Sequence, residues 1–244
     1  MSNPIMTRGF TTREYIGLEQ MTVSGTVNKL FIMFILLIIA FSAVWNQYAL
    51  GYTDKVNMIG IGCSITGFML ALIIIFTRKA MNVLVPIYAF CEGAALATIS
   101  AIFNSMYPGI VVQAVACTFF TLFSMLLAYK LGLIKPTEKF KRCVVIATMG
   151  FAVTYLIAFV LTLLGVNTLG LMLYSASTAS IVISILACVV AALNLILDFD
   201  FVERGEQMGI AKEMEWYGAF GLMVTLVWLY IEILKLLAKL NSRR

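Results

Sequence analysis

Carboxylates within apolar sequence are the residues of this chain best suited to chemistry. Glu232 lies deep in the last apolar stretch, and Asp198 and Asp200 lie at the end of the preceding one, LNLILDFDFVE. A carboxylate at the centre of a bilayer costs roughly 2.5–3.5 kcal/mol on insertion scales, so it persists where it faces protein or water and has a partner. We therefore expect the last two apolar segments to bring carboxylates together inside a helical bundle.

A third acidic residue, Glu92, lies near the middle of another apolar stretch, NVLVPIYAFCEGAALATIS. Pro86, six residues earlier, frees a backbone carbonyl group in that helix. Small residues follow, which allows another helix to approach closely: Gly93, Ala94, Ala95 and Ala97. Glu92 can form a structural hydrogen bond to a neighbouring helix or line an ion or proton route, and we favour the second role.

Two carboxylates that lie close together in a low-dielectric interior cannot both ionise at low cost, so they share one proton at lower pH. Calcium prefers six to eight oxygen ligands. Asp198 and Glu232, with waters, would therefore give a transient calcium site on a permeation path. Asp198 and Asp200 point roughly 200° apart on a helix, so only one of them can face the interior. Lys235, three residues after Glu232, offers a competing explanation as a local ion pair.

The composition indicates an integral membrane protein. Of the 244 residues, 62% are hydrophobic and 12% are charged, whereas soluble domains carry about 25% charged residues. Seven apolar runs are long enough to cross a bilayer as helices. They lie near Leu30–Trp45, Asn57–Phe76, Asn82–Phe103, Pro108–Ala128, Cys143–Leu164, Gly170–Leu197 and Tyr217–Ala238.

We expect an all-α polytopic membrane protein with three parts. These are a cytoplasmic N-terminal segment over residues 1–29, a seven-helix transmembrane domain over residues 30–240 and a basic tail over residues 241–244. The lysines and arginines concentrate in the N-terminal segment and in the links after the second, fourth and sixth spans, which places the N-terminus in the cytoplasm of a cell-membrane protein. The basic tail either follows a seventh crossing or stays inside, and the earlier helices favour seven crossings.

Several other classes of function lack the residues they need. The chain has no histidine, and its five cysteines show no CxxC spacing, so we expect buried thiols and no resident cofactor. No nucleophile–base pair or metal motif indicates an enzyme. The net charge of +5 is explained by how the charges are distributed between the loops of a protein embedded in the lipid bilayer, so no nucleic-acid partner is expected. The acids from Glu203 to Glu215 are expected to form a solvated cytoplasmic link.

These features together resemble the transmembrane Bax inhibitor motif family, in its bacterial branch. The resemblance covers essentially the whole chain and rests on ILDFDFVE at the end of the sixth span, LYIEILKLL in the last span, and SNPIMTRGF, MTVSGTVNK and EWYGAF elsewhere. Glu232 matches an aspartate of an LYLDFINLF-like motif, and Asp198 matches the aspartate of an FDTQ-like motif. Two departures are the extra methylene of Glu232 and the longer link between the two acids.

The resemblance implies a last helix surrounded by the other six. It also implies a pH-sensitive calcium leak channel of the bacterial inner membrane, in which carboxylates of the last two helices share a proton and act as the sensor. Calcium ions and protons would then be its ligands. The family has an arginine latch near the end of its second helix, and Arg78 is the counterpart here.

Two other functions remain open at the level of sequence. A proton-coupled transporter of a small solute would be favoured by inverted repeats with broken helices, of which Pro86 is the one hint. A non-transport scaffold would instead act on membrane stress or protease machinery, and its partner would be another membrane protein.

Overall fold

The computed structural model describes residues 19–166 and 175–243. Within this part of the chain, seven helices are each long and apolar enough to cross a membrane. They are α2 (Val23–Ala49), α3 (Thr53–Thr77), α4 (Met81–Met106), α5 (Ile110–Lys130), α6 (Glu138–Leu163), α8 (Thr178–Gln207) and α9 (Met214–Asn241). The prediction of an all-α, seven-span protein is confirmed, although α2 begins within the range assigned to the N-terminal segment.

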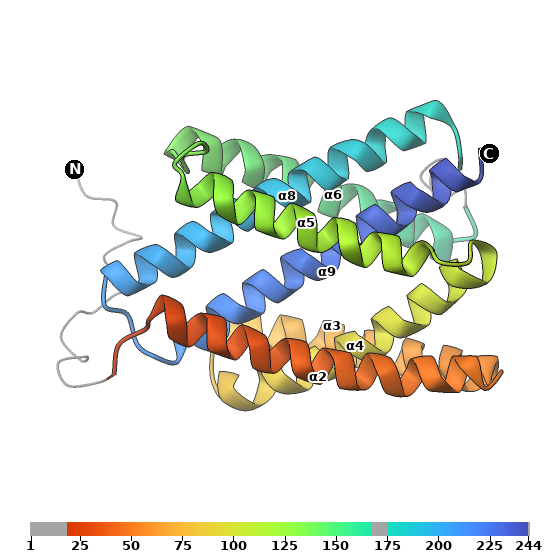
Figure 1. Cartoon of the computed structure of the whole chain (residues 1–244), viewed down its shortest axis with the longest axis horizontal. Coiled ribbons are helices and arrows are strands. Elements are labelled where there is room, and N and C mark those ends of the chain that lie inside the picture. Colours follow the sequence, from red (N-terminus) through yellow and green to blue (C-terminus); the bar gives the residue numbers. More distant parts are fainter. Residues whose placement is uncertain (1–18, 167–174, 244) are drawn as a thin grey trace.

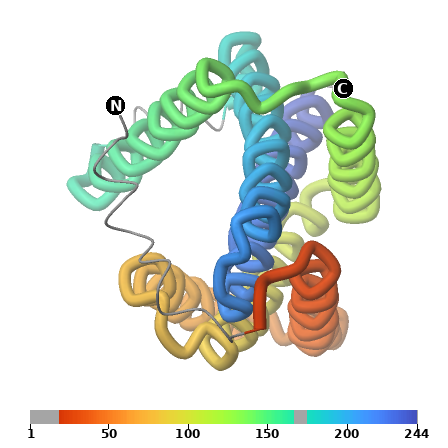
Figure 2. Tube along the Cα trace, turned by 90° about the vertical axis from the view of Figure 1, so that its left-hand side faces the viewer, coloured from red at the N-terminus to blue at the C-terminus, as the bar shows by residue number. Residues whose placement is uncertain are grey.

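The last helix, α9, lies at the centre of the bundle. It runs between α2, α3 and α4 on one side and α5, α6 and α8 on the other (Figure 1). The end-on view shows α8 and α9 in the middle, with α3 and α6 well apart from each other on one side of them and α2 and α5 on the other (Figure 2). α9 contacts α2, α4, α5 and α8 and buries a broad apolar face against them: Phe220, Met223, Leu226, Leu229 and Leu234.

The outer helices expose large apolar side chains, including Phe31 of α2, Phe68 of α3, Phe120 of α5 and Leu156 of α6. Apolar surface of this extent is not left in contact with water in a soluble monomer, and in a bilayer it contacts lipid chains. The chain is therefore a multi-pass membrane protein.

The two ends of α9 lie at opposite ends of the bundle. At its start, Glu215 contacts Thr22, which caps the start of α2. Past its end, the Nε atom of Arg243 donates to the backbone oxygen of Ala176 at 2.8 Å, next to the start of α8. The seventh helix therefore crosses the whole bundle, and the basic tail follows a full crossing.

Small residues on α4 allow close packing against α2, as the sequence predicted. A Cβ atom at Gly93 would lie 2.8 Å from the Cα atom of Leu37, closer than such atoms can approach. Ala94 and Ala97 are buried against α2 in the same region. Pro86 lies inside α4 without ending it. This contact fixes α4, and Glu92 with it, relative to the rest of the bundle.

The sixth span differs from its prediction at its end, while its predicted start at Gly170 lies outside the described residues. The predicted end was Leu197, but α8 continues to Gln207, so Asp200 lies inside the helix. An ion pair of 2.9 Å joins the Oδ1 atom of Asp200 to the Nε atom of Arg204 one turn later, and such a pair supports a helix.

The first described residues, 19–22, form an N-terminal strap across the link between α8 and α9. The backbone nitrogen of Met21 donates to the oxygen of Ile210 at 2.8 Å, and that of Lys212 donates to the oxygen of Glu19 at 3.0 Å. The side chain of Lys212 also donates to the carboxylate of Glu19, and this hydrogen bond raises the pKa of Lys212.

A buried carboxylate joins the strap to α9. Glu215 is 1% exposed, accepts from the backbone nitrogen and the hydroxyl of Thr22 at 2.9 and 3.0 Å, and forms an ion pair with Lys29. Gly25 makes room for it, because a side chain there would overlap the carboxylate. The prediction that the acids up to Glu215 are solvated is wrong for Glu215, since α2 supplies partners that the local sequence does not reveal.

Candidate functional site

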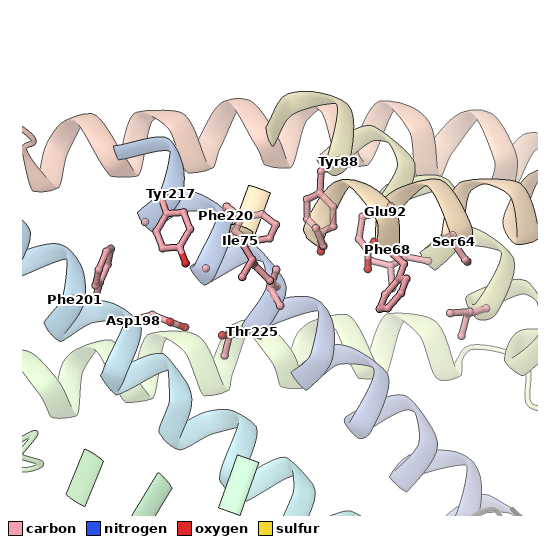
Figure 3. Close-up of a pocket in the computed structure, with 18 residues that line it drawn as sticks. Ser64, Phe68, Ile75, Tyr88, Glu92, Asp198, Phe201, Tyr217, Phe220 and Thr225 are labelled. Atoms are coloured by element: carbon pink, nitrogen blue, oxygen red, sulfur yellow. The ribbon is translucent and has the colours of Figure 1, made fainter. Parts of the chain in front are cut away.

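A cavity of about 600 Å³ lies between α3, α4, α8 and α9, in the half of the bundle nearest the start of α9. Among the described residues, its wall includes two carboxylates, Glu92 and Asp198, and no lysine or arginine. Most of the remaining wall is apolar, with five aromatic side chains (Figure 3): Phe68, Tyr88, Phe201, Tyr217 and Phe220.

Asp198 enters the cavity from α8 and faces small residues of α9. A Cβ atom at Gly221 would lie 3.6 Å from the Oδ1 atom of Asp198, and Thr225, one turn further along α9, points toward the same carboxylate (Figure 3). The Oδ2 atom of Asp198 is buried and has no hydrogen-bond partner among the described residues. A buried polar atom without a partner is costly, so a proton, a water molecule or a cation is needed beside it.

Glu92 enters the same cavity from α4, apart from Asp198 (Figure 3). Gly67 of α3 packs beside it, since a Cβ atom there would lie 3.2 Å from the Oε2 atom of Glu92. The structure therefore places Glu92 on the cavity wall, where the favoured interpretation of the sequence needs it. Its role in an ion or proton route stays a prediction.

Asp200 lies on the other side of α8, away from the cavity. It is 6% exposed and forms ion pairs with Lys141 of α6 and with Arg204 of its own helix. The near-opposite directions expected for Asp198 and Asp200 are therefore observed, and Asp198 is the one that lines the cavity.

Glu232 lies in a separate group of side chains, which we call the Glu232 cluster: Tyr155, Trp228, Glu232 and Lys235. Its Oε1 atom accepts hydrogen bonds from the hydroxyl of Tyr155 at 2.9 Å, from Nε1 of Trp228 at 3.2 Å and from Nζ of Lys235 at 2.6 Å. Its Oε2 atom is buried without a partner in the described chain. The local ion pair that the sequence offered as a competing explanation is thus present.

Asp198 and Glu232 do not meet in this conformation. Asp198 faces Thr225, whereas Glu232 follows seven residues later on α9, which is about 10 Å further along a helix. In the described chain, the Oδ2 atom of Asp198 does not bond to Glu232, and the Oε2 atom of Glu232 does not bond to Asp198. The structure brings Asp198 and Glu92 to one cavity and leaves Glu232 beyond it, so a proton shared by Asp198 and Glu232 stays a prediction.

Arg78, the predicted latch, lies at the C-terminal end of α3 with a left-handed φ of 51°. Its guanidinium group lies 5.2 Å from the ring centre of Tyr217, which lines the cavity. Within residues 19–166 and 175–243, the ion pairs do not include Arg78. Its contact with the cavity therefore runs through an aromatic ring, and its role as a latch stays a prediction.

Several contacts of these sites were missed from sequence. Trp228 could have been found, because it lies four residues before Glu232 on the same helix face. The contacts of Tyr155 and of the buried Lys239 could not have been found from the sequence. Lys239 donates to the hydroxyl of Ser184 at 2.6 Å and to the backbone oxygen of Ser180 at 3.3 Å across the α8–α9 contact, and only the tertiary structure determines such partners.

Comparison with known proteins supports the resemblance suggested by the motifs. A family model described as Bax inhibitor 1 like matches residues 3–242, which is essentially the whole chain. A comparison with curated proteins gives no significant match.

Proposed function

The chain belongs to the Bax inhibitor 1 like family, and from this premise we propose that it is a pH-sensitive leak channel for calcium and other cations. We place it in a bacterial inner membrane, with its N-terminus in the cytoplasm. No contact among the described residues specifically favours the alternatives, a proton-coupled solute transporter or a scaffold.

One observation carries this proposal. Within residues 19–166 and 175–243, a carboxylate oxygen of Asp198 is buried without a partner in a cavity whose wall also contains Glu92 and no positively charged side chain. Charges inside a low-dielectric site interact strongly, so this cavity attracts cations and repels anions. That is the electrostatic requirement for a cation-conducting path.

The pH dependence follows from the same groups. At lower pH, protons neutralise Asp198 and Glu92, and the attraction for cations weakens. At higher pH, both carboxylates ionise and a cation replaces the protons. Ser64 of α3, Tyr88 of α4, and Tyr217 and Thr225 of α9 are the other polar side chains of the described cavity wall. The guanidinium group of Arg78 of α3 lies 5.2 Å from the ring centre of Tyr217. Calcium prefers six to eight oxygens, so two carboxylates with waters hold it only transiently, as a leak requires.

In this proposal the Glu232 cluster, which occupies the next part of α9, closes the path. Trp228 is bulky, and Lys235 neutralises the carboxylate of Glu232 at 2.6 Å. Opening would have to separate this ion pair or move the cluster. In that state the carboxylate of Glu232 would become available to a proton or a cation passing from the cavity.

The test is calcium flux into liposomes that contain the purified protein and a trapped calcium indicator. We expect flux to be faster at pH 8 than at pH 6, and Asp198→Asn and Glu92→Gln each to lower the flux and flatten its pH dependence. Asp54→Asn, a matched change of an exposed aspartate at the start of α3, should behave as wild type. An unchanged pH response in both cavity variants would refute the proposal.

A further inference from the structure

We propose that the cavity between α3, α4, α8 and α9 binds a hydrophobic organic cation, in which an ammonium or phosphonium centre is carried by an aromatic or alkyl body. This inference shares Glu92 and Asp198 with the proposed function. It concerns binding and does not require that the protein conducts ions.

The lining of the cavity favours an organic cation over a metal ion as a stably bound ligand. No group of three or more histidine, cysteine, aspartate or glutamate side chains that could hold a metal occurs in the described chain. The wall contains instead five aromatic rings. Aromatic faces attract cations that have lost their water, and they do so best for bulky, weakly hydrated cations such as quaternary ammonium groups.

The size of the cavity also fits this class of ligand. Pockets for drug-sized molecules measure about 300–1,000 Å³ and are mostly apolar, with a few polar groups that fix the ligand. This cavity measures about 600 Å³. Asp198 supplies the fixing group, because in the described part of the chain its buried Oδ2 atom has no partner and the cavity wall has no lysine or arginine that competes for it.

In this proposal the ligand reaches the cavity from the lipid. Four residues of the cavity wall remain more than a third exposed: Phe68, Ile75, Phe201 and Val224. All four are apolar and lie on membrane-spanning helices. A molecule that dissolves in the bilayer therefore meets the cavity at these residues, by a route separate from the one that ions would take along the bundle. This access selects cations whose bodies are hydrophobic.

The experiment measures the binding of tetraphenylphosphonium to the purified protein in lipid nanodiscs, by equilibrium dialysis at pH 8. Tetraphenylborate, an anion of the same shape, is assayed separately. The variant Asp198→Asn/Glu92→Gln removes both charges with little change of volume, and Asp54→Asn is its surface control. Phe68→Leu tests the aromatic wall without altering charge, and Phe76→Leu, an exposed phenylalanine of α3 outside the cavity, is its matched control.

We expect saturable binding of tetraphenylphosphonium that weakens at least tenfold in the double variant and at least threefold in Phe68→Leu, with both controls as wild type. Tetraphenylborate should show no saturable binding. Equal binding of the anion, or unchanged binding of the cation in the double variant and in Phe68→Leu, would overturn the inference. Binding of tetraphenylphosphonium without calcium flux would support this inference and refute the proposed leak channel. Calcium flux that depends on pH, without binding of tetraphenylphosphonium, would refute this inference and support the leak channel.

Discussion

Removal of Lys235 tests whether Glu232 is held as an ionised carboxylate inside the bundle. Glu232 is 1% exposed, and the side chain of Lys235 is 11% exposed. Breaking a buried ion pair by removing one partner costs about 3–5 kcal/mol. In Lys235→Met, the carboxylate keeps its hydrogen bonds from Tyr155 and Trp228, so we expect a loss near the lower end, about 3 kcal/mol.

The assay is thermal unfolding of the purified protein in detergent. For a chain of this length, each kcal/mol shifts the melting temperature by about 2–4 °C, so Lys235→Met should melt about 6–12 °C below wild type. Lys139→Met, an exposed lysine at the start of α6, is the control and should melt as wild type.

The double variant Glu232→Gln/Lys235→Met completes a double-mutant test of this ion pair. It removes both charges, and the amide oxygen still accepts from Tyr155 and Trp228. Replacing both partners of a buried pair is often nearly neutral, so most of the stability lost in Lys235→Met should return. If the double variant melts as low as the single one, or the single one melts as wild type, Glu232 is not an ionised partner of Lys235 in the folded protein.

Three further changes probe the packing that positions the cavity. Gly93→Val should lower the melting temperature by about 2–12 °C, because overpacking costs about 1–3 kcal/mol and a Cβ atom there already meets the backbone of Leu37. Lys29→Met should leave Glu215 buried without its cation and cost about 3–5 kcal/mol in unfolding experiments. Asp200→Asn should lower the melting temperature, through its pairs with Lys141 and Arg204, yet leave the pH dependence of calcium flux unchanged because it lies outside the cavity.

The fold was accessible from sequence because a bilayer limits the possible structures. A long apolar segment in lipid must satisfy its own backbone, so it forms a helix, and the seven apolar runs became seven helices. The ends were less certain. α8 continues past the predicted Leu197 because Asp200 pairs with Arg204 one turn later and with Lys141 of α6, and the second partner is invisible to local pattern.

The candidate site was accessible only in part, for a similar reason. Buried acids stand out in apolar sequence, so Glu92, Asp198 and Glu232 were identified. Their grouping depends on the depth at which each helix packs. Each residue along a helix adds about 1.5 Å of depth. Thr225, which faces Asp198, precedes Glu232 by seven residues on α9, so the two acids lie at different depths. Sequence motifs do not encode that offset.

The separation of the two acids limits how strongly Glu232 can affect the charge of Asp198. Two unit charges about 10 Å apart interact by about 1.7 kcal/mol at an effective dielectric constant of about 20, and Lys235, at 2.6 Å from Glu232, cancels most of that field. While the ion pair is intact, proton sensing should therefore depend on Asp198 and Glu92. We expect Asp198→Asn to remove most of the pH response of calcium flux and Glu232→Gln to leave most of it. An equal loss in both variants would mean that Asp198 and Glu232 share a proton directly, in a conformation in which α8 and α9 have moved past each other.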